Sequence, residues 1–272
     1  MDIALFSPSS LFAGPDSDDD GAGGVCGFYS SSETEKALAP EDFVERSHRF
    51  PGLDICVREF AFHELNANLL WPGTFAFAEW LVQHGSLLEG RRTVELGSGT
   101  GALAIFLRKA FGLDVTTSDY DDVEIEDNIS HNCMINGIAP VLPHIRHSWG
   151  EPFPVPDPDW DLVIASDILL YVKQYGKLIK TLCFLLKRFK PKSNGAAPVE
   201  TNPHDSPGEQ LPSPAFLMSW RRRIGKEDES LFFDGCEDAG LHVKHLGSRV
   251  YCIWPKELWC AAHEEPGYYG KP

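Results

Sequence analysis

The sequence has no apolar run long enough to cross a bilayer as a helix. Its most apolar helical stretch, residues 178–186, is short and is flanked by lysines. The first residues, Met-Asp-Ile-Ala-Leu-Phe-Ser-Pro, show no basic cluster followed by an apolar core, which is the pattern of a secretory signal. We therefore expect a soluble chain without a membrane partner and without an export signal.

The cysteines never form a C-x-x-C pair, and their number, seven, is odd. They are Cys26, Cys56, Cys133, Cys183, Cys236, Cys252 and Cys260. This spacing argues against a disulfide framework and against a zinc site, and it favours free thiols in a reducing compartment. The ten histidines are dispersed too, so we expect no metal. We predict a cytoplasmic location, with the nucleus as a second compartment.

Basic residues are few: 24 lysines and arginines stand against 40 acidic residues, which gives a formal net charge of -16. Residues 1–45 hold ten of the acids and one base, so this segment contributes -9 and the rest of the chain only -7. The remainder is mildly acidic, which disfavours a nucleic-acid partner to a modest degree.

Two segments lack the apolar residues that a folded core requires. Residues 1–40 are rich in Ser, Gly, Asp and Pro, and we predict a disordered acidic tail there. Residues 191–214 hold six prolines among Gly, Ser, Asn and Thr, and we predict a flexible insertion. We expect residues 41–272 to form one domain that contains this insertion.

Between these segments, strand and helix patterns alternate, which is typical of an α/β fold with a doubly wound, mostly parallel sheet. The predicted strands are 93–96, 114–118, 161–165, 215–219, 241–246 and 249–253, and the predicted helices are 102–110, 123–136, 176–188 and 226–239. The last two strands are joined by Gly247-Ser248 alone. A connection that short permits only antiparallel pairing, so we expect the sheet to end in a hairpin.

A glycine-rich turn, Gly97-Ser98-Gly99-Thr100-Gly101, joins the first of these strands to the first helix. Glycines let a backbone turn sharply and approach a ligand, and a helix N-terminus favours an anionic group. The pattern also satisfies the G-x-G-x-x-G/A rule of dinucleotide sites, with Ala102 in its last position. The turn alone therefore indicates a nucleotide-like ligand and leaves its identity open.

Two carboxylates limit which nucleotide-like ligands can bind at this turn. Glu95 lies two residues before Gly97, where it can meet the ammonium of the methionine part of S-adenosylmethionine (SAM) but would repel a pyrophosphate. Asp119 ends the next strand, 20 residues after Gly99, where an acid can accept both hydroxyls of a ribose. SAM and NAD share that ribose, so Asp119 supports an adenosine ligand and Glu95 favours SAM.

Six short segments with distinctive residues follow one another along residues 60–253. They are Leu70-Trp71-Pro72-Gly73, Val94-Glu95-Leu96-Gly97-Ser98-Gly99-Thr100-Gly101, Thr117-Ser118-Asp119-Tyr120, Ser148-Trp149-Gly150, Trp160-Asp161-Leu162-Val163-Ile164-Ala165-Ser166-Asp167 and Trp220-Arg221-Arg222-Arg223. In these segments the sequence resembles class I SAM-dependent methyltransferases and, within them, the family 16 protein lysine methyltransferases. The resemblance implies a seven-stranded Rossmann-like sheet, SAM as cofactor and a lysine side chain of a protein as substrate.

The resemblance also implies the site residues. Position by position, it implies a cofactor site lined by Trp71, Gly97, Ser98, Gly99, Asp119, Trp149 and Ser166, and we expect Glu95, Gly101 and Tyr120 to belong to the same site. Asp167 would orient the incoming nucleophile, and Tyr171 would supply a wall or a hydroxyl beside it. The family usually shows D-x-x-Y after this strand, whereas Asp167 and Tyr171 are separated here by one residue more.

Three other functions stay open at this point. A methyltransferase for RNA or for a small molecule is the first, although only Arg221-Arg222-Arg223 offers a short basic surface. These arginines fit strand-end salt bridges or contacts to an acidic substrate equally well. A non-catalytic SAM-fold binding module would show a broken loop or lack Asp119, and an NAD-linked oxidoreductase is disfavoured by Glu95 and by the closing hairpin.

Overall fold

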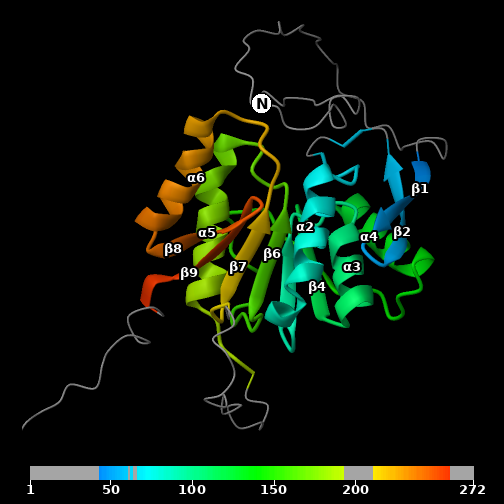
Figure 1. Ribbon diagram of the computed structural model, residues 1–272, viewed down its shortest axis with the longest axis horizontal. Coiled ribbons are helices and arrows are strands. Elements are labelled where there is room, and N and C mark those ends of the chain that lie inside the picture. Colours follow the sequence, from blue (N-terminus) through cyan, green and yellow to red (C-terminus); the bar gives the residue numbers. More distant parts are fainter. Residues whose placement is uncertain (1–42, 61, 64–65, 193–210, 258–272) are drawn as a thin grey trace, which may run out of the picture.

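Seven strands form one sheet, in the order β5-β4-β3-β6-β7-β9-β8, in the computed structural model (Figure 1). The structure describes residues 43–60, 62–63, 66–192 and 211–257. The strands are β3 (Arg92–Leu96), β4 (Asp114–Asp119), β5 (His144–Arg146), β6 (Leu162–Ser166), β7 (Ala215–Ser219), β8 (Leu241–Gly247) and β9 (Val250–Pro255). The first five strands run parallel, and β9 is antiparallel to both β7 and β8.

The central strands are buried on both faces, as their continuous apolar sequences require. In β6, Leu162 and Ile164 pack into one hydrophobic cluster, while Val163 and Ala165 pack into a second cluster on the opposite face. β7 repeats this alternation. The predicted doubly wound sheet is therefore confirmed, with a separate apolar core on each side.

Helices cover both faces of the sheet (Figure 1). The helices α2 (Pro72–Gln83), α3 (Ala102–Phe111) and α4 (Val123–Ile135) contribute to the first cluster, and α5 (Tyr175–Lys187) and α6 (Lys226–Asp238) contribute to the second. Short 3-10 helices lie at η2 (Gly85–Leu88) and η3 (Val172–Gln174). The four helices predicted from the sequence are all present, with ends that differ by one residue at most.

The C-terminal hairpin is confirmed, but its turn lies one residue later than predicted, because Gly247 pairs with Val250 as the last residue of β8. Ser248 and Arg249 join β8 to β9 with φ angles of 48° and 57°. Positive φ at both central residues of a two-residue loop is the type I′ arrangement, which matches the right-handed twist of paired strands.

Four elements escaped the sequence analysis: α2, β5 and a two-stranded hairpin, β1 (Phe43–Phe50) with β2 (Leu53–Phe60). The hairpin packs on α4 through three asparagines spaced four residues apart. Asn132 Oδ1 accepts the Arg58 N–H at 2.7 Å, and Asn136 Oδ1 accepts the Cys56 N–H at 3.0 Å. Asn128 Nδ2 donates to the Arg58 carbonyl at 3.2 Å. The asparagines thus satisfy the outer backbone edge of β2, where a neighbouring strand would otherwise pair.

The end of the predicted insertion belongs to the folded domain. Leu211 is buried in the first cluster. Arg91 Nη2 donates to the Leu211 carbonyl at 2.6 Å, and Arg91 Nη1 donates to the Pro212 carbonyl at 2.9 Å. The rest of the insertion from residue 193 to 210, and the predicted tail, lie outside the described residues.

Candidate functional site

The glycine turn after β3 places three glycines in the left-handed backbone region, and two of them are also tightly packed. Gly97, Gly99 and Gly101 all have positive φ angles, of 66°, 52° and 77°. A Cβ at Gly97 would lie 2.7 Å from a methyl group of Ile168, and one at Gly101 would lie 3.1 Å from Ile129. At Gly99 the nearest atom would be a backbone oxygen at 3.7 Å, which is ordinary contact. Gly99 is therefore the glycine whose surroundings leave room for a ligand.

Glu95 is a buried carboxylate at the end of β3. Its neighbours Val94 and Leu96 point into the second cluster, so alternation turns Glu95 toward the face covered by α2 and α3. Its Oε2 atom is buried without a hydrogen-bond partner among the described residues. Burial raises the pKa of Glu95 well above its usual range, although the Ser98 side chain opposes the shift. A buried acceptor of this kind requires a partner that the protein itself does not supply.

Asp119 ties the turn to the end of β4. Its Oδ2 accepts the Gly99 N–H at 2.7 Å, and its Oδ1 accepts the Tyr120 N–H at 2.7 Å. Burial raises the pKa of Asp119, and the two backbone donors work against that shift. An ionised carboxylate has about four acceptor positions, so two positions are left for further donors.

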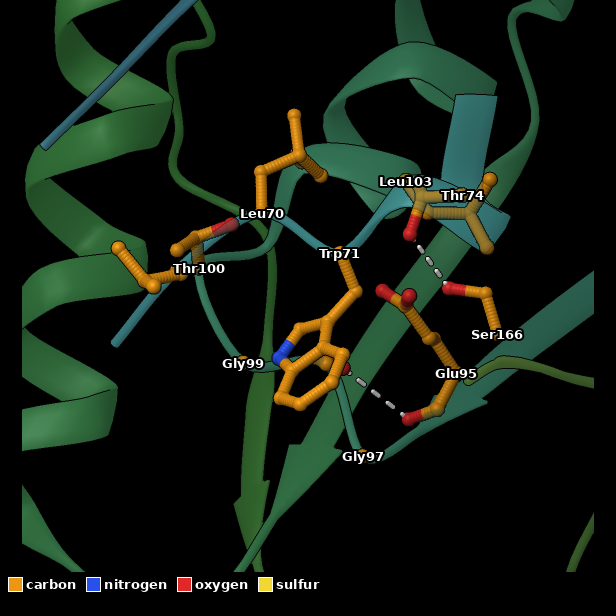
Figure 2. Close-up of a pocket in the computed structure, with 12 residues that line it drawn as sticks. Leu70, Trp71, Thr74, Glu95, Gly97, Gly99, Thr100, Leu103 and Ser166 are labelled. Atoms are coloured by element: carbon orange, nitrogen blue, oxygen red, sulfur yellow. Dashed lines mark hydrogen bonds between the residues drawn. The ribbon is translucent and has the colours of Figure 1, made fainter. Parts of the chain in front are cut away.

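A cavity lies above the turn and is covered by residues 66–74, which we call the covering segment (Figure 2). In Figure 2 the Trp71 ring lies next to the turn at Gly97 and Gly99. The Glu95 carboxylate points into the same cavity from the end of β3. Thr74 Oγ1 and Ser166 Oγ share a hydrogen bond of 2.9 Å at one end. The cavity is lined by Leu69, Leu70, Trp71, Thr74, Glu95, Gly97, Ser98, Gly99, Thr100, Ala102, Leu103 and Ser166.

Six of the ten cofactor residues predicted from the sequence line this cavity: Trp71, Glu95, Gly97, Ser98, Gly99 and Ser166. The other four surround it. Gly101 is the N-cap residue that precedes α3, and Asp119 accepts a hydrogen bond from the Gly99 N–H of the turn. Trp149 lies on the far side of Gly97, where its Cζ2 would be 3.7 Å from an added Cβ. The Tyr120 side chain is exposed next to Asp119.

The predicted catalytic pair contacts the covering segment and does not line the cavity. Asp167 Oδ2 accepts the Gly73 N–H at 2.6 Å, and its Oδ1 accepts the Arg221 N–H at 2.8 Å. The Tyr171 hydroxyl accepts a hydrogen bond from the Asn66 side chain. The structure therefore brings both residues beside the site, but it directs them toward the backbone and side chains that cover it.

The apolar part of the wall was not predicted from the sequence; Leu69, Leu70 and Leu103 form it, with Thr74 and Thr100 beside them. No chemical motif marks these positions, because they act through shape. Among the described residues no group of three or more His, Cys, Asp or Glu is arranged to hold a metal. None of the described helices is both long and apolar enough to span a membrane.

A match to a protein family agrees with the geometry of the glycine turn, of the unpaired Glu95 oxygen and of Trp71. The match extends across half of the chain. The sequence model of the family described as lysine methyltransferase matches residues 56–191. The chain belongs to the lysine methyltransferase family. The match runs from β2 to the end of α5, so it includes the covering segment, the glycine turn and the end of β6.

Several curated relatives of this lysine methyltransferase family member are methyltransferases of proteins. A protein N-terminal and lysine N-methyltransferase of Aspergillus fumigatus is 26% identical and covers 60% of this chain and 65% of its own length. An EEF1A lysine methyltransferase of Xenopus tropicalis is 29% identical, with 59% and 72% covered. A histone-arginine methyltransferase of Xenopus laevis is 30% identical, with 44% and 51% covered. The chain thus spans about half to two thirds of the length of some of these relatives.

The fold has solved counterparts at low identity. The 16S rRNA N2 G1207 methyltransferase of T. thermophilus, determined in complex with AdoMet and guanosine, superposes with a TM-score of 0.52. It is 15% identical, and the likeness covers 82% of this chain and 53% of that one. At this identity the likeness supports the Rossmann-like fold and says nothing of the substrate.

Proposed function

We propose that this protein is a SAM-dependent N-methyltransferase whose substrate is a lysine side chain of a protein. The observation that carries the proposal is the unpaired Glu95 carboxylate oxygen, buried in a cavity between the glycine turn and Trp71. A group with a positive charge on one side and an apolar body on the other fits this cavity. The methionine part of SAM has both features.

The residues present fit SAM at each of its parts. Glu95 would pair with the ammonium group, which would give its buried Oε2 atom a hydrogen-bond partner. Gly99 offers space beside the turn, and the start of α3, which no side chain caps, would face the methionine carboxylate. The open acceptor positions of Asp119 would take the ribose hydroxyls, next to the exposed Tyr120. The partly buried Trp149 lies close to Gly97 in the same turn.

Bound SAM supplies an electrophilic methyl group, so the chain's own task is to align a nucleophile and to exclude water. The covering segment provides the exclusion, because Leu70 and Trp71 close the cavity above the turn. A lysine amine, with a reference pKa of about 10.4, must lose its proton before it attacks. An apolar, aromatic approach lowers that pKa by desolvating the ammonium form, and Trp71 is placed to form such a wall.

The substrate class follows from the family and from its relatives. The named relatives act on the α-amino group or a lysine of a protein, or on a histone arginine. What they share is a nitrogen atom of a protein. Lysine is the target in the description of the family model, and we propose it for this chain.

The test separates cofactor from substrate. Calorimetry of the pure protein should show binding of SAM and of its demethylated product, and no binding of NAD. Incubation with isotope-labelled SAM and a cell lysate should then label a protein band. Acid hydrolysis of that band should release labelled methyl-lysine. Labelled methyl-arginine would show that the target residue is arginine and not lysine. Label in RNA would show that the substrate is a nucleic acid and not a protein. An absence of SAM binding would overturn the proposal.

A further inference from the structure

Asp167 is the most constrained charged residue at the site. It follows β6 directly and has a φ angle of 55°, in the left-handed region that few residues other than glycine adopt. Its side chain is 1% exposed. A strained backbone around a buried charge persists only where the surrounding contacts impose it, and such positions gather at functional sites.

The contacts of Asp167 come from two segments that are far apart in the chain. Gly73, at the start of α2, donates to Oδ2, and Arg221, beyond β7, donates to Oδ1. The Asp167 N–H itself donates to the Ser219 carbonyl at 2.9 Å, at the end of β7. A Cβ at Gly73 would lie 2.4 Å from the Asp167 carboxylate, so only glycine fits there. The carboxylate therefore joins the covering segment to the ends of two strands.

Arg223 completes this arrangement. Its Nη2 lies 3.6 Å from Asp167 Oδ2, and its guanidinium lies 4.4 Å from the centre of the Trp71 ring. The Arg223 side chain is only 11% exposed. Its Nε and Nη2 groups have no hydrogen-bond partner among the described residues, so charge and ring stacking hold the guanidinium. Asp167 and Arg223 thus fix the backbone before Thr74 and the ring of Trp71 respectively.

We propose that Asp167 and Arg223 form a positioning pair that sets the Trp71 wall of the cofactor cavity, and that Asp167 does not contact the nucleophile. The proposal rests on the proposed function, because it takes SAM as the occupant of the cavity. Asp167 does not line the cavity, and its 1% exposed side chain, held by two backbone N–H groups, leaves no room for a nucleophile beside it. Trp71 and Thr74, which the pair places, do line it.

The first experiment measures the dissociation constant for SAM by calorimetry on the full chain. Asp167→Asn removes the charge and replaces an acceptor by an amide N–H that faces another donor. We expect SAM affinity to fall about 10-fold to 100-fold, in line with the loss expected from a misplaced site wall. Arg223→Lys keeps the charge beside Asp167 and so protects folding, but it loses the planar stack on Trp71. We expect a loss of several-fold for this variant.

A matched control separates positioning from general damage to a buried ion pair. Glu229 has an 8% exposed side chain and accepts a hydrogen bond from Arg222 Nε at 2.7 Å, away from the cavity. Glu229→Gln should lower the melting temperature but leave the SAM dissociation constant unchanged. At saturating SAM, Asp167→Asn should recover most of the parent rate of label transfer. A low rate with unchanged SAM affinity would overturn the proposal and restore Asp167 as a residue that acts on the nucleophile.

Hydrogen exchange tests the pair without SAM. In Asp167→Asn and Arg223→Lys, the amides of residues 66–74 should exchange faster than in the parent and in Glu229→Gln. Unchanged exchange together with unchanged SAM affinity would overturn the positioning pair and leave the proposed function intact. A parent protein that fails to bind SAM would overturn the proposed function, and with it the role of the pair in cofactor binding.

Discussion

Among the single residues of the cavity, Glu95 favours ligand binding and lowers the stability of the ligand-free protein. Glu95 is a carboxylate that folding buries without a full set of partners, and this costs free energy in the ligand-free protein. Natural proteins keep such groups where a ligand satisfies them. These opposing effects make Glu95 the residue whose substitution separates the two properties most clearly.

We expect Glu95→Gln to stabilise the free protein and to weaken SAM binding by about 1.5–3 kcal/mol, the range for a hydrogen bond to a charged group. Burial raises the pKa of Glu95, so the folded state keeps its proton to higher pH than the unfolded chain. Stability is therefore lost as pH rises from the ordinary value of 4.5 through the raised pKa. Melting curves across this range should show a smaller loss in Glu95→Gln.

The same pKa predicts the pH dependence of binding. SAM affinity should fall as pH drops through the raised pKa of Glu95, because the protonated acid cannot pair with the ammonium. Calorimetry at several pH values would measure this, and the dependence should be absent in Glu95→Gln. Equal pH profiles for the parent and the variant would show that Glu95 does not face the ammonium.

Gly99→Arg should abolish SAM binding while the chain still folds. The added side chain would enter the cavity, and the φ angle of 52° adds a strain of about 1–3 kcal/mol. Gly112→Arg is the matched control, because Gly112 has a φ angle of 66° and no atom within 4 Å of an added Cβ. Both variants should lose similar stability, measured by thermal melting. If Gly112→Arg also lost SAM binding, backbone strain alone would explain the effect.

At the scale of elements, the hairpin of β1 and β2 is fixed to the site by α4. Asn132 accepts a hydrogen bond from the Arg58 N–H and donates to the Thr100 carbonyl at 2.9 Å, so one side chain links the hairpin to the glycine turn. A second link runs from Glu59 on β2, whose Oε1 accepts the Leu70 N–H at 3.1 Å. The hairpin thus positions the covering segment as well as shielding the sheet.

Asn132→Ala should lower stability by about 2–5 kcal/mol, because it leaves two buried backbone groups unsatisfied at about 1–3 kcal/mol each and removes buried side-chain contacts. Chemical denaturation measures the loss, and hydrogen exchange should show faster exchange at the Arg58 amide. His131→Ala serves as the control, since its contact to Glu45 is a surface pair worth well under about 1 kcal/mol. A similar loss in both variants would contradict the linking role of Asn132.

At the scale of the whole molecule, one sheet carries two cores, and the site lies where the carboxyl ends of β3, β4 and β6 meet the first of them. Ligands in open α/β sheets bind outside these ends. Residues 211–214, the described end of the predicted insertion, lead into the amino end of β7, at the opposite end of the strands from the cavity. Changes in residues 211–214 should therefore affect folding before they affect SAM binding.

Replacing residues 193–210 by a short Gly-Ser linker should leave the melting temperature nearly unchanged, because loop length alters closure entropy only slowly. Extending the deletion through Pro214 should lower it by several degrees, since Leu211 and the two carbonyls held by Arg91 are lost. Removal of residues 1–40 should also leave the melting temperature unchanged. Scanning calorimetry checks all three, and equal values for the two insertion deletions would show that Leu211 contributes little.

Local sequence patterns were enough to predict six of the sheet strands, four of the helices and the chemistry of the glycine turn, but not β1, β2, α2 or β5. Strand and helix patterns, the glycines around Gly99 and the acids Glu95 and Asp119 depend on near neighbours in the chain, so periodicity and spacing located them. The same holds for the closing hairpin, because a two-residue connection leaves only one pairing. Six of the predicted cofactor residues accordingly line the cavity.

What covers the site, and what holds that cover in place, depends on contacts between residues that are far apart in the chain. Gly73 and Asp167 are 94 residues apart in the chain, and Asn132 and Arg58 are 74 apart. No local pattern encodes such pairs, because each depends on how separate elements pack. That is why Asp167 could be placed beside the site from sequence, while its partners, and the part played by Arg223, could not. The physical reason is that a carboxylate's role is set by the donors that reach it, and these come from distant segments.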